Sequence, residues 1–438
     1  MNRLTQPRQS WARTAVRLLV LLVGLCACAL GAWFSGRTGI TRLLAAYGNS
    51  ASVQAAVDEA VRLNPNDPEA HFARSVTLLE QGQHEDARTA IERAAALRPR
   101  DYRLWQELGY VRDLAGDPEG ALIAYRNAVA QAPFYAQPRW QLGNLLLRLD
   151  RLPEAFAALA RAAADDSGRL PNVVDLAWGA FEGDTRAIEA ALAPRNDAWR
   201  LELARVFARH DKIAEARVLW RAVKRIPDGP RNRLVNELLT GKHFADAREV
   251  WESGQIRGAN GATNPAVTDG GFEQPMKTDE LGFGWRSLPS SPALRFVRDQ
   301  TLPQSGQFSL RFDWNGNSDA MTPLVWQYVP VKPQQRYTLS FAVRTEELVS
   351  GALPEVALLD AESDGRAFSQ AVLLARGTAG WQTHSLSFVT GDATQAVRLI
   401  IRRQDCTMLP CPIFGKTWFD DFVVTTTAQT ISTSASAP

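Results

Sequence analysis

Two spacings of apolar residues divide this chain of 438 residues. In the first half, prolines and alanines recur every 34 positions, at Pro65, Pro99, Pro133 and at Ala87, Ala121, Ala155. A fixed period of this length indicates stacked helical hairpins, each with an apolar face that only a neighbouring hairpin can cover. In the last third, apolar and polar residues alternate instead, which indicates β-strands. Because stacked hairpins usually form binding surfaces, the pattern favours a binding protein over an enzyme.

The hairpin at residues 102–133 shows the period most completely. Gly109 and Ala121 are small, as expected where the two helices of a hairpin cross closely, and Pro133 ends the second helix because proline lacks a backbone donor. The chain here resembles the tetratricopeptide repeat family, whose consensus has Trp, Leu, Gly, Ala, an aromatic residue, Ala and Pro at the positions of Trp105, Leu108, Gly109, Ala121, Tyr125, Ala128 and Pro133. We expect an α-solenoid over residues 37–253, with degenerate hairpins after residue 168.

An apolar segment near the N-terminus predicts a membrane helix. Residues 18–36 carry no charged side chain, and the segment before them, residues 1–17, is basic. Basic residues hold their side of a membrane helix in the cytoplasm, so we expect a single-pass protein of the bacterial inner membrane with the bulk of the chain in the periplasm. Two alternatives remain open: a signal peptide cleaved near Ala27–Ala32, and a lipoprotein attached through one of the two cysteines in the segment.

Beyond a Gly-, Asn- and Ala-rich linker at residues 254–268, alternating segments such as Phe308–Trp314 and Tyr337–Val343 predict an antiparallel β-sandwich over residues 269–424. The last residues, 425–438, are rich in Thr, Ser and Ala, which predicts disorder. The sandwich resembles the galactose-binding-like jelly-roll carbohydrate-binding modules in three segments: Gly270-Gly-Phe-Glu, Ser305-Gly-Gln-Phe-Ser-Leu-Arg-Phe and Trp418-Phe-Asp-Asp-Phe.

This resemblance implies a structural calcium ion between the first and last strands, held by Glu273 and by Asp420 or Asp421, because calcium prefers oxygen ligands. The alternative is that the aspartate pair caps an edge strand. Sugar binding needs aromatic faces that stack on sugar rings, and the candidates are Trp326 and Tyr328 on one face of a strand and Trp314 beside a polar loop. The alternative for all three aromatic residues is packing in the core.

The register of the repeats also predicts a ligand groove on the inner faces of the first helices. Its expected residues are Arg103, Gln106, Tyr110 and Asp113 in one repeat and Gln137, Trp140, Asn144 and Arg148 in the next. An aromatic pair with amide and arginine neighbours suits a protein partner or a sugar. The alternative is an ordinary solvated face.

Charge and motifs narrow the function further. The chain has 49 Lys and Arg against 47 Asp and Glu, so nothing favours a nucleic-acid partner. The motifs HExxH, GxSxG, GxxxxGK[ST] and GxGxxG are absent from the sequence, although a glycoside hydrolase with distant carboxylates remains open. Cys406 and Cys411 are expected to form a disulfide in an oxidising compartment, with two free thiols as the alternative.

The sequence therefore predicts a membrane-anchored, non-enzymatic adaptor, whose groove binds a protein partner and whose sandwich binds a polysaccharide. Proteins of this layout resemble accessory components of exopolysaccharide or O-antigen assembly, an expectation that rests on architecture alone. The alternative is a protein-assembly scaffold whose sandwich binds no glycan.

Overall fold

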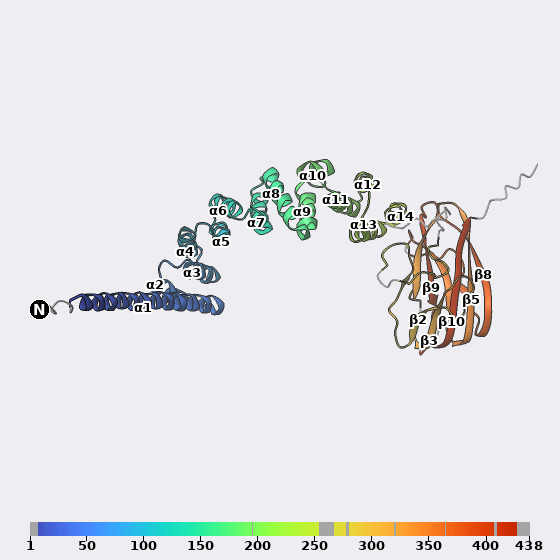
Figure 1. Ribbon diagram of the computed structural model, residues 1–438. Helices are drawn as coiled ribbons and strands as arrows, with labels where there is room; N and C mark the ends of the chain where they lie inside the picture. The colour runs from blue at the N-terminus through green and yellow to red at the C-terminus, as the bar shows by residue number, and fades with distance from the viewer. Residues whose placement is uncertain are drawn as a thin grey trace, which may run out of the picture. The chain divides into compact units, whose positions relative to one another are not determined.

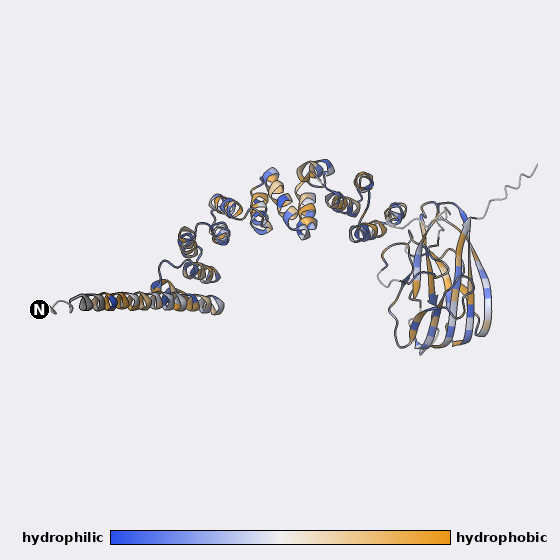
Figure 2. Cartoon of the chain, viewed as in Figure 1, coloured by the Kyte–Doolittle hydropathy of each residue, from blue (hydrophilic) through white to orange (hydrophobic). Residues whose placement is uncertain are grey.

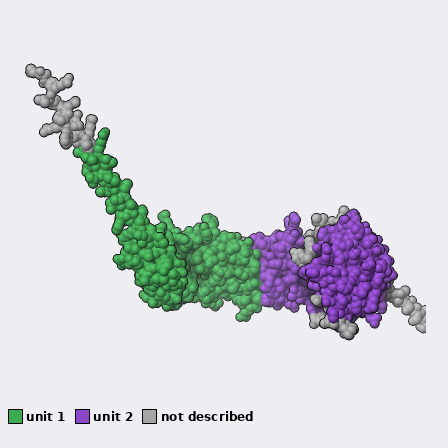
Figure 3. All heavy atoms as spheres, turned by 90° about the horizontal axis from the view of Figure 1, so that it is seen from below, with its two compact units in different colours: residues 1–193 green, residues 194–438 purple. Residues whose placement is uncertain are grey.

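The computed structural model describes residues 8–194, 196–253, 267–276, 280–318, 321–363, 365–406 and 410–426, with side chains from residue 15 onward. Contacts within the chain divide it into two compact units, residues 1–193 and 194–438, coloured green and purple in Figure 3. The sequence suggested a boundary at the 254–268 linker, most of which lies outside the described residues. The contacts instead group the helices after residue 193 with the β-strands.

The first unit contains helices α1 to α10 (Figure 1). Their bounds are α1 Arg8–Ala51, α2 Gln54–Leu63, α3 Pro68–Glu80, α4 His84–Leu97, α5 Tyr102–Leu114, α6 Pro118–Gln131, α7 Ala136–Arg148, α8 Leu152–Asp165, α9 Leu170–Ala180 and α10 Thr185–Leu192, with the short 3-10 helix η1 at Ser167–Arg169.

Helix α1 contains both the predicted membrane segment and the start of the solenoid, which the sequence analysis placed in separate segments. Its segment Ala15–Ala51 is long and apolar enough to cross a membrane, and none of its most apolar window is buried inside the protein. The end of the same helix belongs to the solenoid, because Thr41 and Ala45 are buried and Ala45 packs in one cluster with Val57 of α2. The helix expected at residues 18–36 is therefore continuous with the first helix of the repeat stack.

Three regular hairpins follow, α3–α4, α5–α6 and α7–α8, and they confirm the predicted repeat. Ala87, Ala121 and Ala155 are completely buried. A Cβ atom added to Gly109 would lie 2.8 Å from the ring of Tyr125, so the two helices cross closely where the pattern placed a glycine. The starts of the helices also repeat. The carboxylates that precede α3, α5 and α6 each accept a backbone N–H group of the first turn.

The first of these repeats departs from the consensus but keeps its contact. His71 stands where the next repeat has Trp105. Nε2 of His71 lies 2.9 Å from the carbonyl oxygen of Pro65, and Nε1 of Trp105 donates to the carbonyl oxygen of Pro99 at 2.7 Å. Both ring nitrogens thus tie the first helix of a repeat to the turn before it.

The second unit begins with two further helix pairs. These are α11 (Asp197–Arg209) with α12 (Ile213–Arg221), and α13 (Asp228–Thr240) with α14 (Phe244–Glu252). Ala216 and Ala247 are completely buried, as expected for the second helices of degenerate hairpins. Ion pairs join one pair to the next, including Arg217 with Asp246 at 2.8 Å.

After α14, the described residues of the second unit form ten strands, and orange and blue bands mark their hydrophobic and hydrophilic residues in Figure 2. Their bounds are β1 Arg286–Ser287, β2 Leu294–Asp299, β3 Ser309–Asn317, β4 Val325–Pro330, β5 Arg336–Ser350, β6 Pro354–Asp360, β7 Val372–Leu373, β8 Gly377–Val389, β9 Ala396–Arg403 and β10 Pro412–Thr426. They make two five-stranded sheets, ordered β1-β4-β9-β6-β7 and β2-β3-β10-β5-β8, with antiparallel pairing throughout.

The two sheets pack face to face around one apolar core and form the expected β-sandwich. Val325 and Val329 of the first sheet lie in the same cluster as Phe312, Phe341 and Phe419 of the second. The strands are longer than the alternation suggested, because β5 has 15 residues and its alternation changes where it bulges against its neighbours.

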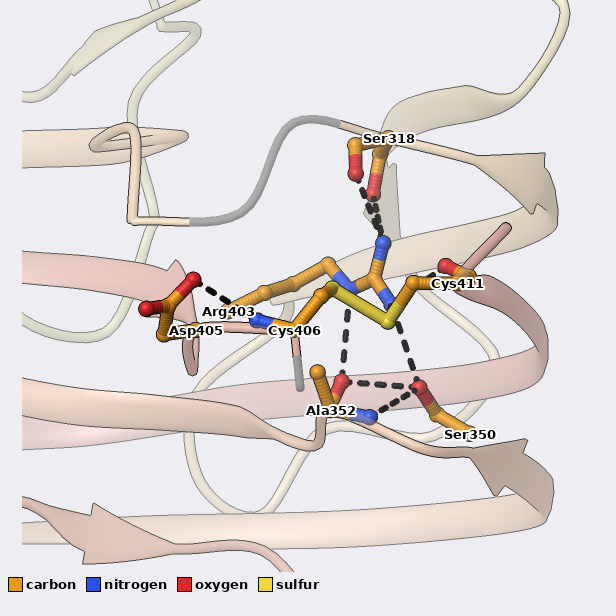
Figure 4. The surroundings of a disulfide bond; sticks show 7 residues. All are labelled: Ser318, Ser350, Ala352, Arg403, Asp405, Cys406 and Cys411. Carbon is orange, nitrogen blue, oxygen red and sulfur yellow. Dashed lines mark hydrogen bonds between the residues drawn. A yellow bond between two sulfur atoms is a disulfide. The ribbon is translucent and has the colours of Figure 1, made fainter. Parts of the chain in front are cut away.

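One end of the sandwich is organised around a buried arginine (Figure 4). Arg403 has no exposed surface and donates to the carbonyl oxygen of Ala352 at 3.2 Å, to that of Ser318 at 2.6 Å and to that of Cys411 at 2.8 Å. Burial lowers the pKa of this guanidinium. Cys406 and Cys411 are joined beside it as a disulfide with Cα atoms 6.1 Å apart, so Arg403 and the bridge hold the same loop.

Candidate binding surfaces

Helix α5 carries the first half of the predicted groove. Tyr110 is 45% exposed, and Gln106 is partly exposed. Arg103 is exposed but pairs with Asp101 at the start of its own helix, at 2.9 Å. Asp113 pairs with Arg148 of α7. The two arginines are therefore neutralised within the repeats, and Tyr110 and Gln106 remain the open groups.

Helix α7 carries the second half of the groove. The guanidinium of Arg169, from the next repeat, lies 5.1 Å from the ring centre of Trp140 and donates to the Gln137 amide at 2.9 Å. Asn144 is partly exposed. One face of Trp140 is thus already occupied by a cation, which lowers its availability for a ligand.

Sequence reasoning missed two features of these repeats that lie outside the predicted groove residues. Glu107 is partly buried, and burial raises the pKa of its carboxyl. Phe134, in the turn between α6 and α7, is 86% exposed, and the ring of its neighbour Tyr135 lies 5.2 Å from that of Tyr102. Turn residues carry no periodic signal, so the repeat pattern could not single out this aromatic pair.

The predicted aromatic pair of the sandwich lies on the outer face of β4. Its neighbours Val325 and Val329 point into the core, as the alternation predicted. Trp326 packs against Leu359 and Ile400, and it is partly buried. The ring of Tyr328 lies 5.4 Å from that of Phe244 of α14. Neither ring is therefore fully exposed to solvent. Tyr328 contacts a helix that was predicted to belong to a separate domain.

Trp314 belongs to the core, which corrects its candidacy as a sugar platform. Only 4% of its surface is exposed, and its indole Nε1 donates to Thr417 at 3.1 Å. Its partner on the neighbouring strand β10 is Gly415. The polar residues after Trp314 suggested exposure, but β3 continues through Asn317, so this tryptophan lies within a strand and not at its end.

The predicted calcium ligands lie around one loop. Oε1 of Glu273 accepts two backbone N–H groups of the 304–308 loop, Oδ2 of Asp420 accepts two more, and Asp421 accepts the Ser305 hydroxyl. Within the described residues, no group of three or more His, Cys, Asp or Glu side chains is placed to hold a metal ion. The three carboxylates therefore accept hydrogen bonds from the 304–308 loop, and by themselves they do not form the ligand set of a calcium ion. Calcium binding stays a prediction, which a melt with calcium and with chelator would test.

Helix α14 meets the sandwich along a contact that we call the helix–sandwich seam, formed by Phe244, Arg248, Trp251, Phe283 and Tyr328. The ring of Trp251 lies 5.8 Å from that of Phe283, and the guanidinium of Arg248 lies 5.0 Å from the Trp251 ring. Trp251 Nε1 donates to Glu280 at 3.3 Å. No short-range pattern could have paired these residues, because they are separated by the linker.

Comparison with known proteins supports the repeats. The tetratricopeptide repeat family model matches residues 42–102, 76–136 and 107–169, so this part of the chain consists of tetratricopeptide repeats. Cellulose synthase operon protein C of Xanthomonas axonopodis pv. citri (strain 306) is 27% identical over 300 residues. The match covers 64% of this chain but only 19% of that protein.

Solved structures resemble parts of the chain more weakly. A crystal structure of MamA protein is 15% identical, covers 41% of this chain and 96% of its own, and has a TM-score of 0.33. A CBM4 structure is 16% identical, covers 37% of this chain and 99% of its own, and has a TM-score of 0.28. TM-scores this low do not establish that this chain shares a fold or a function with either protein.

Proposed function

We propose that this chain is a non-enzymatic adaptor for exopolysaccharide assembly in a bacterial cell envelope. The repeat groove would hold a protein partner and the sandwich a glycan. The observation that carries the proposal is a tetratricopeptide stack with an open tyrosine and amides in its groove, in a chain that resembles a cellulose synthase operon protein. Open aromatic and amide groups on a rigid helical stack suit recognition of a partner.

The same proposal places the chain in the inner membrane. Helix α1 is apolar over a length that can span a bilayer, and the basic residues before it favour a cytoplasmic N-terminus. A cleaved signal peptide would leave the rest of the chain in the same compartment. The disulfide of Cys406 with Cys411 fits an oxidising periplasm. Alkylation of intact cells before reduction should leave both thiols unmodified, and labelled thiols would place this domain in the cytoplasm.

The groove can be tested by complementation. A strain that lacks the gene would receive the wild-type chain or a Tyr110→Ala/Gln106→Ala variant, and secreted polysaccharide would be measured with the amount of chain in membranes. We expect the variant to reduce secretion while its level stays normal, because truncating central contacts weakens a partner's binding about tenfold or more. Phe134→Ala is the matched control, since it removes an exposed aromatic side chain outside the groove. Normal secretion with the groove variant would contradict the proposal.

A second candidate function is a protein scaffold whose sandwich is purely structural. The contact of Tyr328 with Phe244 favours it, because a sugar-stacking ring should be free on one face. In that case the sandwich completes the last helix pair, and the whole chain should bind no polysaccharide.

A further inference from the structure

The outer face of the first sheet contains a hollow beside the helix–sandwich seam. Its volume is about 490 Å³, and its lining consists of Tyr328, Leu359, Asp360, Ala361, Gly365 and Arg398. The strand pairing places Arg398 of β9 between Tyr328 of β4 and Leu359 of β6. We call this site the Arg398 hollow.

Arg398 lacks the partner that its neighbours on β9 have. Arg402 pairs with Glu355 at 2.7 Å, and Arg403 is satisfied by carbonyl oxygens. Within the described residues, the Arg398 side chain makes neither a hydrogen bond nor an ion pair, and its Nε atom is buried without a partner. A partly buried cation without a counter-charge is costly, so the position calls for an anion.

A second arginine reinforces the positive charge. The guanidinium of Arg286 lies 5.5 Å from the ring centre of Tyr328. Its Nη2 donates to the carbonyl oxygen of Gly282 at 3.1 Å, while its Nε is buried without a partner. Burial lowers the pKa of Arg286, and the nearby charge of Arg398 contributes to this shift. The two cations therefore repel each other across Tyr328.

Within the described residues, the acidic groups nearest the hollow make no hydrogen bond or ion pair with Arg398 or Arg286. Asp360 accepts the Glu362 backbone N–H at 2.9 Å and the Thr394 hydroxyl at 3.1 Å. Burial raises the pKa of the Glu362 carboxyl, and Lys242 donates to the Glu362 carbonyl oxygen at 2.7 Å. Arg398 therefore lies without a direct partner beside an aromatic and aliphatic wall, in a hollow that Asp360 also lines.

We propose that the Arg398 hollow binds a carboxylate-bearing sugar of an acidic polysaccharide. Arg398 donates to the carboxylate with Arg286 as a second source of positive charge. Leu359, together with the part of Tyr328 that lines the hollow and is left uncovered by Phe244, contacts the sugar ring. The apolar wall fits a sugar ring with a carboxylate better than it fits a bare inorganic anion. This inference rests on the proposed function and adds to it the chemical class of the glycan.

The test uses calorimetry on the full chain in detergent micelles at low salt. The probes are a tetrasaccharide of glucuronic acid, the neutral cellotetraose, and inorganic phosphate. We expect the acidic tetrasaccharide to bind about tenfold or more tightly than the neutral one, and the affinity to fall as salt rises. Arg398→Gln should weaken it by about ten- to a hundredfold, the range for a lost charge-assisted hydrogen bond.

Controls separate this inference from its premise. Arg376→Gln removes an exposed arginine elsewhere in the sandwich and should leave binding unchanged. Arg398→Gln should not lower the melting temperature, because it removes an unpaired cation. Equal binding of both tetrasaccharides would overturn the acidic specificity but keep a glycan function. Binding of phosphate alone, or loss of stability in Arg398→Gln without a change in affinity, would overturn the site. If the wild-type chain bound neither tetrasaccharide, the proposed sugar site would also be overturned. The groove test would then still decide the adaptor function.

Discussion

The regular hairpins α3–α8 and the terminal hairpin α13–α14 both bury the alanine of their second helix but have different outer faces. Ala121 of α6 and Ala247 of α14 are both completely buried. A regular hairpin has another repeat beside it. Helix α14 instead presents Phe244 and Trp251 to the sandwich, where they meet Tyr328 and Phe283.

The difference shows what a repeat consensus encodes. Small residues inside a hairpin persist because two helices must always cross there. Residues on the outer face change with what they pack against, so bulky aromatic residues replace the consensus where the neighbour is a β-sheet. At α14, the departure from the consensus is therefore a sign of a new packing partner and not a loss of the helical-hairpin fold.

Trp251→Ala should have the largest effect on stability, and this effect should be confined to the terminal hairpin and the sandwich. Truncating a tryptophan that is 8% exposed should cost about 3–5 kcal/mol of the second unit's free energy of unfolding, because it opens a cavity and removes the ring contact with Phe283. Hydrogen exchange measured by mass spectrometry should show faster exchange in α13–α14, with α3–α8 unchanged.

Phe134→Ala is the control for this truncation, because its ring is already exposed and its loss should change stability little. Unchanged exchange in α13–α14 after the Trp251 substitution would mean that the helix–sandwich seam contributes little to stability.

Substitution of one glycine in each region compares helix–helix packing with helix–sandwich packing directly. A Cβ atom on Gly282 would lie 2.0 Å from the Trp251 indole, and one on Gly109 would lie 2.8 Å from the Tyr125 ring. Each substitution to alanine should cost about 1–3 kcal/mol in chemical unfolding, because the ring must move out of a well-packed site. The closer approach predicts the larger loss for Gly282.

Gly179→Ala is the matched control within helix α9. A Cβ atom there would meet no atom within 4 Å, so the change should stabilise the helix by about 0.5–1 kcal/mol. A loss at Gly179 as large as at Gly109 would show that packing is not the reason for the small residue.

The sequence predicted the parts of the fold that depend on local spacing. The 34-residue period located the hairpins, and the alternation at Tyr337–Val343 located strand β5. What it missed requires contacts between distant segments. Tyr328 was predicted to be either a sugar-stacking or a core residue, and its contact with Phe244 was not predicted because α14 and β4 are far apart in sequence. Nothing in the local sequence distinguished Arg398 from the other residues of its strand. Trp314 was misread because a polar loop next to a strand does not reveal how far that strand continues.

The last comparison between the sandwich and the regular repeats uses the pH dependence of their stability. Asp299 is 4% exposed and lies at 2.7 Å from Trp418 Nε1 and at 3.1 Å from Arg311. Burial alone would raise the pKa of this carboxyl, but the hydrogen bonds from Trp418 and Thr301 and the charge of Arg311 outweigh burial and lower it to about 2. In the repeats, the hydrogen bond from Arg151 also lowers the pKa of Glu154, but Glu154 is exposed, so its pairing adds little stability.

Because the folded-state pKa of Asp299 lies below its reference value of 3.8, its contribution is complete above that pH and is lost as pH falls toward 2. After allowance for solvent screening, we expect the second unit to lose about 1–2 kcal/mol over this window. Urea unfolding at pH 5 and at pH 2.5, followed by hydrogen exchange in the strands and in α3–α8, measures the loss in each region. Asp299→Asn should remove this part of the acid dependence from the sandwich and leave the repeats unchanged. Equal slopes in the wild type and the variant would mean that other carboxylates cause the acid sensitivity of the sandwich.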